Sequence, residues 1–247
     1  MDLKQHYTFQ IRAYEISPNG QVTMATICNY LQESAGLHAD ELNVSSPKIN
    51  KQGLTWVLAR LHVKMHKFPG WLDEIKITTW PAQIERLYTI RDFMLEHNGD
   101  EIGVATSAWV LIDLQTRRPV RRIPEEIVAV HPGKPVRSLE DPFQKLSTVS
   151  DSIHTNKFPI RSQDLDMNSH VNNVVFISLL QDNLPQSQQS GHSIYQLEID
   201  FRGEAFAGDV LFGFCEPSNE ADEYIHSFTR NEDGPEIIRA KTKLKKF

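Results

Sequence analysis

The sequence predicts an α+β fold made of two similar halves, each a curved antiparallel sheet wrapped around one central helix. Three observations predict it. The residues around Arg12 recur around Arg161, at a shift of 149 positions. Each copy then enters a stretch with apolar residues at helical spacing, and after it several strand-like runs closed by turn residues. A repeat of this kind indicates one structural unit used twice.

The two helical stretches carry apolar residues at positions i, i+3, i+4 and i+7, the period of a helix with a buried face. They are Met24, Ile27, Cys28, Leu31 and Ala35 in the first half, and Val171, Val174, Val175 and Leu179 in the second. The second stretch is apolar on most of its surface, which favours a helix enclosed by a curved sheet.

Strand-like runs follow each helix, and the shift between matching positions falls from 149 to 138 and then to 135, so the loops differ in length. The matching segments are 55–65 and 194–202, the turns Phe68–Gly70 and Phe206–Gly208, the hairpin turns at Asn98-Gly99 and Asp233-Gly234, and the final strands 102–112 and 237–247. We therefore expect a first domain at 1–130, a linker at 131–153 and a second domain at 154–247. The linker is charged and contains Pro132, Pro135 and Pro142, which predicts a segment that crosses the surface.

Composition excludes several classes of function. The net charge of −6 argues against nucleic-acid binding. No apolar run reaches the ~18 residues of a membrane span. Residues Met1–Tyr7 lack a signal-peptide pattern, so we expect a cytoplasmic location. The two cysteines, Cys28 and Cys215, and the ten histidines show no metal-ligand spacing, so we predict no metal and no cofactor.

The densest polar cluster precedes the second helix and includes Asp166, Asn168 and His170. The first half has the segment Ser17–Gln21 at this place, with neither an acid nor a histidine. Helix capping explains an Asn or a Ser before a helix, but not a histidine, whose side chain titrates near neutral pH. Backbone N–H groups at the helix start could also bind a developing oxyanion. The sequence therefore predicts a single active site, in the second half.

The run Asp166-x-Asn168-x-His170-Val-Asn-Asn resembles the signature of plant and bacterial acyl-[acyl carrier protein] thioesterases. In that family a Tyr-Arg-Arg-Glu-Cys-like segment follows, and its counterpart here is Phe201-Arg-Gly-Glu204-Ala205. Further similar segments are Asn29–Glu33, Trp80-Pro81, Ala108-Trp109, Thr116–Pro119 and Arg122–Pro124. The resemblance spans nearly the whole chain and implies a double hotdog fold and a hydrolase of fatty acid biosynthesis.

The resemblance also implies roles for four residues. Glu204 would act as general base on water or attack the thioester directly, and we expect its side chain to be partly buried. His170 would orient water or protonate the leaving thiolate, and Asn168 would hold the carbonyl or the water. Asp166 would fix the loop or orient His170, and a purely structural role for it stays open. Because the family's cysteine is Ala205 here and no GxSxG motif occurs, neither a cysteine nor a serine nucleophile is expected.

Two groups of residues are candidates for substrate contacts. Arg117, Arg118, Arg121 and Arg122 could bind the acidic acyl carrier protein and its phosphopantetheine, although a solvated loop is the alternative. Met24, Ile27 and Leu31 are core residues by default and could line an acyl pocket. The four tryptophans are expected to pack in the core or at its rim. Lys241, Lys243 and Lys245 alternate along the last strand and suggest a protected sheet edge.

Three other functions remain possible on sequence grounds. A thioesterase for acyl-CoA would use the same residues. Enoyl-thioester hydratases of this fold have one more residue between the asparagine and the histidine. A non-catalytic acyl-carrier-binding module would have lost the acid and the histidine, which the second half keeps. The sequence leaves open the acyl chain length and whether the chain is a monomer or a homodimer.

Overall fold

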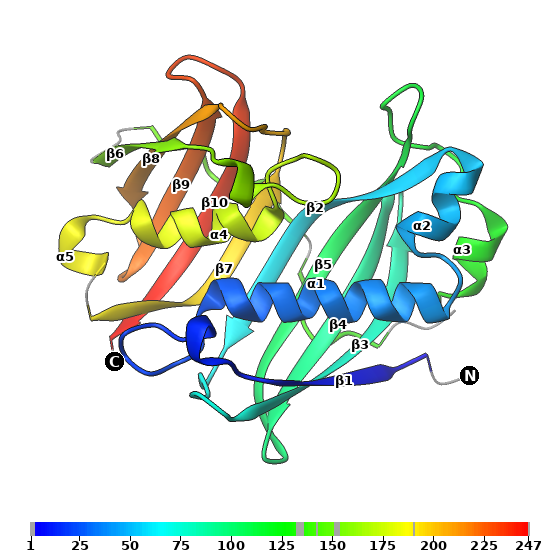
Figure 1. Ribbon diagram of the computed structural model, residues 1–247, viewed down its shortest axis with the longest axis horizontal. Helices are drawn as coiled ribbons and strands as arrows, with labels where there is room; N and C mark the ends of the chain where they lie inside the picture. Colours follow the sequence, from blue (N-terminus) through cyan, green and yellow to red (C-terminus); the bar gives the residue numbers. More distant parts are fainter. Residues whose placement is uncertain (1–2, 132–135, 142, 151–153, 190, 247) are drawn as a thin grey trace.

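The two halves share one order of main elements, a strand, a 3-10 turn, a central helix and then four antiparallel strands (Figure 1). The computed structural model describes residues 3–131, 136–141, 143–150, 154–189 and 191–246. The first half comprises β1 (Gln5–Gln10), the 3-10 turn η1 (Ala13–Glu15), α1 (Met24–Glu41), α2 (Ser46–Ile49), η2 (Asn50–Gln52), β2 (Leu54–Met65), β3 (Glu74–Glu85), β4 (Tyr88–His97), β5 (Asp100–Asp113) and α3 (Glu125–Ala129). The second half comprises β6 (His154–Pro159), η3 (Ser162–Asp164), α4 (Asn173–Asp182), α5 (Gln186–Gln189), β7 (His192–Phe201), β8 (Val210–Pro217), β9 (Glu223–Arg230) and β10 (Glu236–Lys246).

The strands form one antiparallel sheet in the order β1-β3-β4-β5-β2-β7-β10-β9-β8-β6. Strands β2 and β7 pair with each other in the middle and join the two half-sheets. Helices α1 and α4 lie next to each other on one face of this sheet (Figure 1). The first strand of each half, β1 or β6, forms an outer edge.

The halves differ most in the length of the central helix. Helix α1 has 18 residues and α4 has 10. The helices begin at Met24 and Asn173, a shift of 149, whereas the strands that follow begin at Leu54 and His192, a shift of 138. The first half therefore has 11 additional residues here: eight extend α1 by about two turns, and three lengthen the connection that contains α2 and η2.

One hydrophobic core runs through both halves between the two helices and the sheet. It includes Ile27 and Leu31 of α1, Ile177 of α4, and Phe93 and Phe228 from the sheet, each at most 2% exposed. The helical period read from the sequence therefore identifies the buried face of α1, whereas Val175 and Leu179 of α4 are only partly buried. Because the core is continuous, neither half buries its apolar surface independently of the other.

The predicted linker packs on the opposite face of the sheet. Arg137 forms an ion pair with the buried Asp92 of β4, with its Nε 2.9 Å from Oδ2, and Ser138 donates its backbone N–H to the same oxygen at 2.8 Å. Further along, Arg239 of β10 donates to the carbonyl of Leu146. The described part of this segment thus covers the outer face of both half-sheets. The three prolines Pro132, Pro135 and Pro142 lie outside the described residues.

The prediction that the last strand is a sheet edge is wrong. Strand β10 lies between β7 and β9, in the interior of the sheet. Its lysines pair with acids on the neighbouring strands, as Lys241 does with Glu198, with a distance of 2.8 Å between Nζ and Oε1. The alternation of lysines was read correctly as one face of a strand, but that face carries cross-strand ion pairs. The expected last residue of the strand, Phe247, lies outside the described residues.

In the part of the chain that the structure describes, no helix combines the length and the apolar character needed to cross a membrane.

Candidate active site

A tight hairpin carries the predicted site residues into position before α4. The backbone N–H of Asp166 donates to the carbonyl of His170 at 2.7 Å, and the N–H of Ser169 donates to the carbonyl of Asp166 at 3.0 Å. Ser169 has a left-handed conformation, with φ of 62°. The Asp166 carboxylate accepts the N–H of Asn168 at 2.8 Å and that of His170 at 3.2 Å. Asp166 therefore holds the shape of the loop, which is one of the two roles expected for it.

Glu204 is brought to this hairpin by the loop that follows β7. The N–H of Val171 donates to the carbonyl of Ala205 at 2.9 Å, which ties the two loops together. As a result the Glu204 carboxylate lies beside the His170 imidazole, with 3.8 Å between Oε1 and Nε2. Phe206 packs edge-on against the His170 ring, with 5.2 Å between ring centroids. The pairing of histidine and glutamate implied by the resemblance is thus present in the structure.

The expected burial of Glu204 is not observed. Its side chain is 44% exposed and that of His170 is 30% exposed. The carboxylate instead accepts a hydrogen bond from Arg117, which comes from the first half of the chain. The carboxylate lies at the protein surface and is held by an ion pair, and it does not face an enclosed apolar cavity in the described structure.

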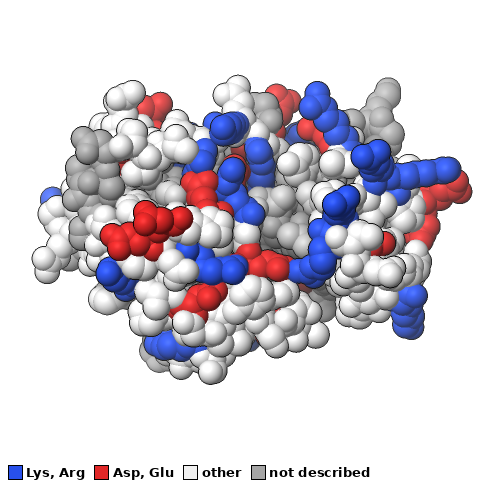
Figure 2. Space-filling view, turned by 90° about the horizontal axis from the view of Figure 1, so that it is seen from above, with Lys and Arg blue, Asp and Glu red and all other residues white. Residues whose placement is uncertain are grey.

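The arginines predicted to bind the carrier protein separate into two groups. Arg117 contacts Glu204 and is therefore part of the site. Arg118, Arg121 and Arg122 are exposed on the same loop between β5 and α3. Arg122 makes a solvent-exposed ion pair with Glu125, with 3.7 Å between Nη2 and Oε1. Figure 2 looks onto the upper face of the molecule and shows Lys and Arg side chains gathered across its middle and over the first half.

The matching hairpin of the first half has the same backbone and an asparagine, Asn19, in the place of Asn168, but it lacks the acid and the histidine. Ser17 donates its N–H to Gln21 at 2.9 Å, and Gly20 donates to Ser17 at 2.9 Å. Gln21 occupies the place of His170. The N–H of Val22 donates to the carbonyl of Pro69, as that of Val171 does to the carbonyl of Ala205, so Phe68 stands where Glu204 does. The match of Phe68 with Phe206 read from the sequence is therefore wrong by two residues. The described structure therefore has the histidine–glutamate pair in one of its two equivalent loops.

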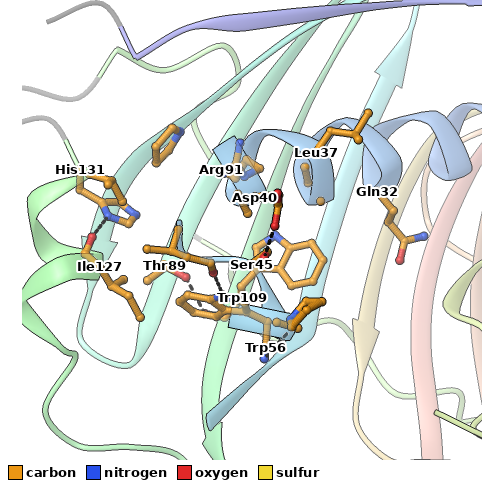
Figure 3. Close-up of a pocket in the computed structure, with 18 of the residues that line it drawn as sticks. Gln32, Leu37, Asp40, Ser45, Trp56, Thr89, Arg91, Trp109, Ile127 and His131 are labelled. Carbon is orange, nitrogen blue, oxygen red and sulfur yellow. Dashed lines mark hydrogen bonds between the residues drawn. The ribbon is translucent and has the colours of Figure 1, made fainter. Parts of the chain in front are cut away.

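A cavity of about 530 Å³ lies in the first half, beneath the two additional turns of α1 (Figure 3). Its lining is mainly apolar and includes Trp56 from β2 and Trp109 from β5, with Ile127 of α3 closing one side. Gln32 lines the end nearest α4, where its Oε1 accepts a hydrogen bond of 3.2 Å from Asn173. Because Asn173 is the first residue of α4, directly after the site hairpin, the cavity begins next to the site.

A buried charged group, Arg91, lies in the wall of this cavity, which Glu33 and Asp40 also line. Arg91 is 9% exposed, and its Nη1 donates to Thr79 at 3.2 Å and lies 3.0 Å from Nδ1 of His38. Burial lowers the pKa of Arg91 to about 10, so it stays charged near neutral pH. Burial and the nearby Arg91 charge lower the pKa of His38 to about 4, which keeps the imidazole neutral.

The predicted acyl-pocket residues lie elsewhere. Ile27 and Leu31 are buried in the central core and are not among the residues that line the cavity. Met24 borders a different cavity of about 640 Å³, beside the first-half hairpin. Sequence reasoning assigned Trp56 and Trp109 to packing and missed their place on the cavity wall. The one signal in the sequence was the longer spacing after the first helix, which indicates additional structure there.

A group of three residues on the outer face could hold a metal ion, although no metal was predicted. His62, Asp141 and Glu198 place their ligand atoms within 4.8 Å of one another. Asp141 lies 2.6 Å from Nδ1 of His62, while Gln196 lies 3.2 Å from Nε2 and Lys241 pairs with Glu198. These contacts already satisfy each ligand atom, so the protein's own hydrogen bonds account for the cluster.

Both cysteines are buried in the core. Burial raises the pKa of the Cys28 thiol far above its usual range and that of Cys215 to about 12. A thiol needs to ionise to act as a nucleophile, and neither does so near neutral pH. Neither cysteine is therefore equipped for a thiol mechanism, in agreement with the interpretation of Ala205.

Comparisons with known proteins show matches along nearly the whole chain. A family model described as "Acyl-ACP thioesterase N-terminal domain" matches residues 2–131, and one described as "Acyl-ACP thioesterase C-terminal domain" matches residues 147–246. The chain is 31% identical to a chloroplastic oleoyl-acyl carrier protein thioesterase of Coriandrum sativum over 88% of this chain. It is 29% identical to oleoyl-acyl carrier protein thioesterase 2 of Arabidopsis thaliana over 96% of this chain. The chain spans 63% and 76% of the lengths of these two relatives.

Two solved structures share the fold across the whole chain. An acyl-ACP thioesterase from Bacteroides thetaiotaomicron matches with a TM-score of 0.87 and 25% identity, covering 99% of this chain and 98% of that one. The 12:0-ACP thioesterase from Umbellularia californica matches with a TM-score of 0.87 and 25% identity, covering 100% and 99%. The predicted double hotdog fold is confirmed, and the chain belongs to the acyl-ACP thioesterase family.

Proposed function

We propose that this protein hydrolyses the thioester of a fatty acyl chain carried by acyl carrier protein and releases the free fatty acid. The observation that carries the proposal is the His170–Glu204 pair, 3.8 Å apart, in a hairpin whose first-half equivalent has Gln21 and Phe68. Family membership supplies the reaction, and the pair supplies the acid–base groups that the reaction needs.

The reaction proceeds through water at the carbonyl carbon. Glu204 takes a proton from the water while the water oxygen bonds to that carbon, and the side-chain amide of Asn168 stabilises the oxyanion. The carbon–sulfur bond then breaks, and His170 gives a proton to the leaving thiolate. The proton held by Glu204 then passes to His170, 3.8 Å away, and both side chains are back in their starting protonation states. In the alternative, Glu204 attacks the carbonyl carbon directly and forms an anhydride, while His170 protonates the leaving thiolate. Water then opens the anhydride, and the proton released goes to His170.

The 530 Å³ cavity is the proposed site for the acyl chain. It has the size and mainly apolar wall of a small-molecule site. It also begins at Gln32, which is hydrogen-bonded to the first residue of α4. The thioester would then lie at the hairpin while the hydrocarbon extends into the first half. The exposed Arg118, Arg121 and Arg122 are the proposed contacts for the acidic carrier protein.

Hydrolysis of acyl-CoA is the second candidate, because the same site and cavity would serve it. A panel of acyl carrier protein and CoA thioesters of short, medium and long chain decides between the two. Release of the thiol is measured for each, and we expect a higher kcat/KM for the carrier-bound substrates. A higher kcat/KM for the CoA esters would favour the second candidate. Binding of acyl carrier protein without release of thiol would instead identify a non-catalytic module.

A further inference from the structure

Arg117 occupies an unusual backbone position at the turn that follows β5. Its φ is 58°, in the left-handed region that a side chain such as arginine seldom adopts. The turn is held by Asp113, whose carbonyl accepts the N–H of Arg117 at 2.8 Å. The Asp113 carboxylate accepts the N–H of Thr116 at 2.7 Å and that of Gln115 at 3.1 Å. Asp113 thus holds the turn in this conformation and fixes the place toward which the Arg117 side chain extends.

That place is the Glu204 carboxylate on the other half of the chain. Arg117 donates from Nη2 to Oε1 of Glu204. Among the described residues this is the only hydrogen bond made by the Glu204 side chain, and the same oxygen is the one 3.8 Å from His170. The backbone of Glu204 is held separately, because its carbonyl accepts a hydrogen bond from Arg230.

The ion pair is a surface contact, with the two side chains 51% and 44% exposed. An exposed pair contributes little to stability, at most about 1 kcal/mol. Its effect on orientation is larger, because a half-exposed glutamate without a partner samples several rotamers. A general base held about 1 Å out of place can reduce the rate by about 100-fold. The contact therefore matters for the reaction more than for the fold.

We propose that Arg117 is a positioning residue for the reaction, and that it acts through Glu204 rather than by binding the carrier protein. The guanidinium keeps the carboxylate aimed at the space beside His170. This inference rests on the proposed function. Arg117 thus differs in role from Arg118, Arg121 and Arg122, which do not reach the second half in the described structure.

The first test is the effect of substitution on kcat and KM, measured with acyl carrier protein thioesters and with carrier-free N-acetylcysteamine thioesters. Arg117→Gln is expected to lower kcat between about 10- and 100-fold on both substrates, with little change in KM. Arg117→Lys restores the charge and should recover part of the loss. Arg118→Gln should instead raise KM for the carrier-bound substrate. Lys67→Gln, which removes an exposed ion pair with Asp100 elsewhere, is the matched control.

The second test is a double-mutant cycle. In a Glu204→Gln background Arg117 has no base to position, so Arg117→Gln should cause no further loss. Thermal midpoints of all variants establish that each is folded. The inference is overturned if Arg117→Gln leaves kcat intact, raises KM for the carrier-bound substrate alone, or adds its full effect to that of Glu204→Gln. A wild-type protein that cleaves none of the thioesters would instead refute the proposed function, and with it this inference.

Discussion

Ser169 has in the second half the backbone conformation that Gly20 has in the first, with φ of 62° and 80°. The two residues are equivalent in the repeat, and each precedes the last residue of its hairpin, Gln21 or His170. The turn therefore forms in both halves, with the histidine in one and without it in the other, so its backbone geometry does not depend on the histidine.

This equivalence predicts the response of Ser169 to substitution. Ser169→Gly removes the steric cost of the left-handed conformation and should leave the thermal midpoint equal or higher, with activity kept. Ser169→Val places a β-branched residue there and should cost about 1–2 kcal/mol. Turnover should fall with it, because the same turn orients His170. A fully active and stable valine variant would show that the turn is not required.

The paired residues His170 and Glu204 should both be needed for turnover. His170→Ala and Glu204→Gln are each expected to reduce kcat at least about 100-fold, the usual contribution of an acid–base group. Gln21→Ala, the same substitution type in the equivalent loop, is the control and should retain activity. Single-turnover rates on an acyl carrier protein thioester measure the chemical step directly. Near wild-type rates for a folded Glu204→Gln protein would rule out the carboxylate mechanism.

Gly36 offers a way to test the acyl cavity without disturbing the core. It lines the cavity from α1, and a Cβ built on it meets no atom within 4 Å. Gly36→Leu should therefore fill part of the cavity and favour shorter acyl chains. Each methylene that no longer fits costs about 0.8 kcal/mol, a factor of about 4 in kcat/KM.

The control for this variant is Gly36→Ala, which should raise stability by up to about 1 kcal/mol through helix propensity, with an unchanged length profile. Product chain length and thermal midpoint are measured together for both. An unaltered length profile in a stable Gly36→Leu protein would place the acyl chain elsewhere.

Stability should fall in mild acid because of His226. This residue is 0% exposed, and burial lowers its pKa from 6.5 to about 3. Below pH 6.5 the unfolded chain therefore binds a proton that the folded protein excludes. The contribution of the neutral His226 to the free energy of unfolding is complete above that pH and decreases as the pH falls toward 3. At pH 5 about 2 kcal/mol of it is lost.

His226→Gln keeps a partner for Thr242, which lies 2.9 Å from the imidazole, and does not titrate. Urea unfolding between pH 7 and pH 5 should show a flatter pH dependence for this variant than for the wild type. An equal slope in both would assign the acid sensitivity to other groups, of which His38 is one.

The sequence was sufficient to predict the features that depend on neighbouring residues. The helix periods, the order of strands and the hairpin with His170 are local patterns, and Glu204 followed from the resemblance. The cavity was missed because it arises where a longer α1 extends over a sheet of unchanged width. The Arg117–Glu204 contact was missed because its residues are 87 positions apart and belong to different halves. The interior place of β10 was missed because strand order between halves has no local signal.

The pairing of β2 with β7 joins two units that have different sequences and are encoded in one chain. In a symmetric dimer of identical subunits, every substitution appears twice, so a change that widens one pocket also alters the other catalytic loop. A covalently joined pair is free of this restriction. Here the first unit has the longer helix and the cavity, and the second has the shorter helix and the His170–Glu204 pair. The join thus allows the proposed acyl cavity and the proposed catalytic pair to change by separate mutations.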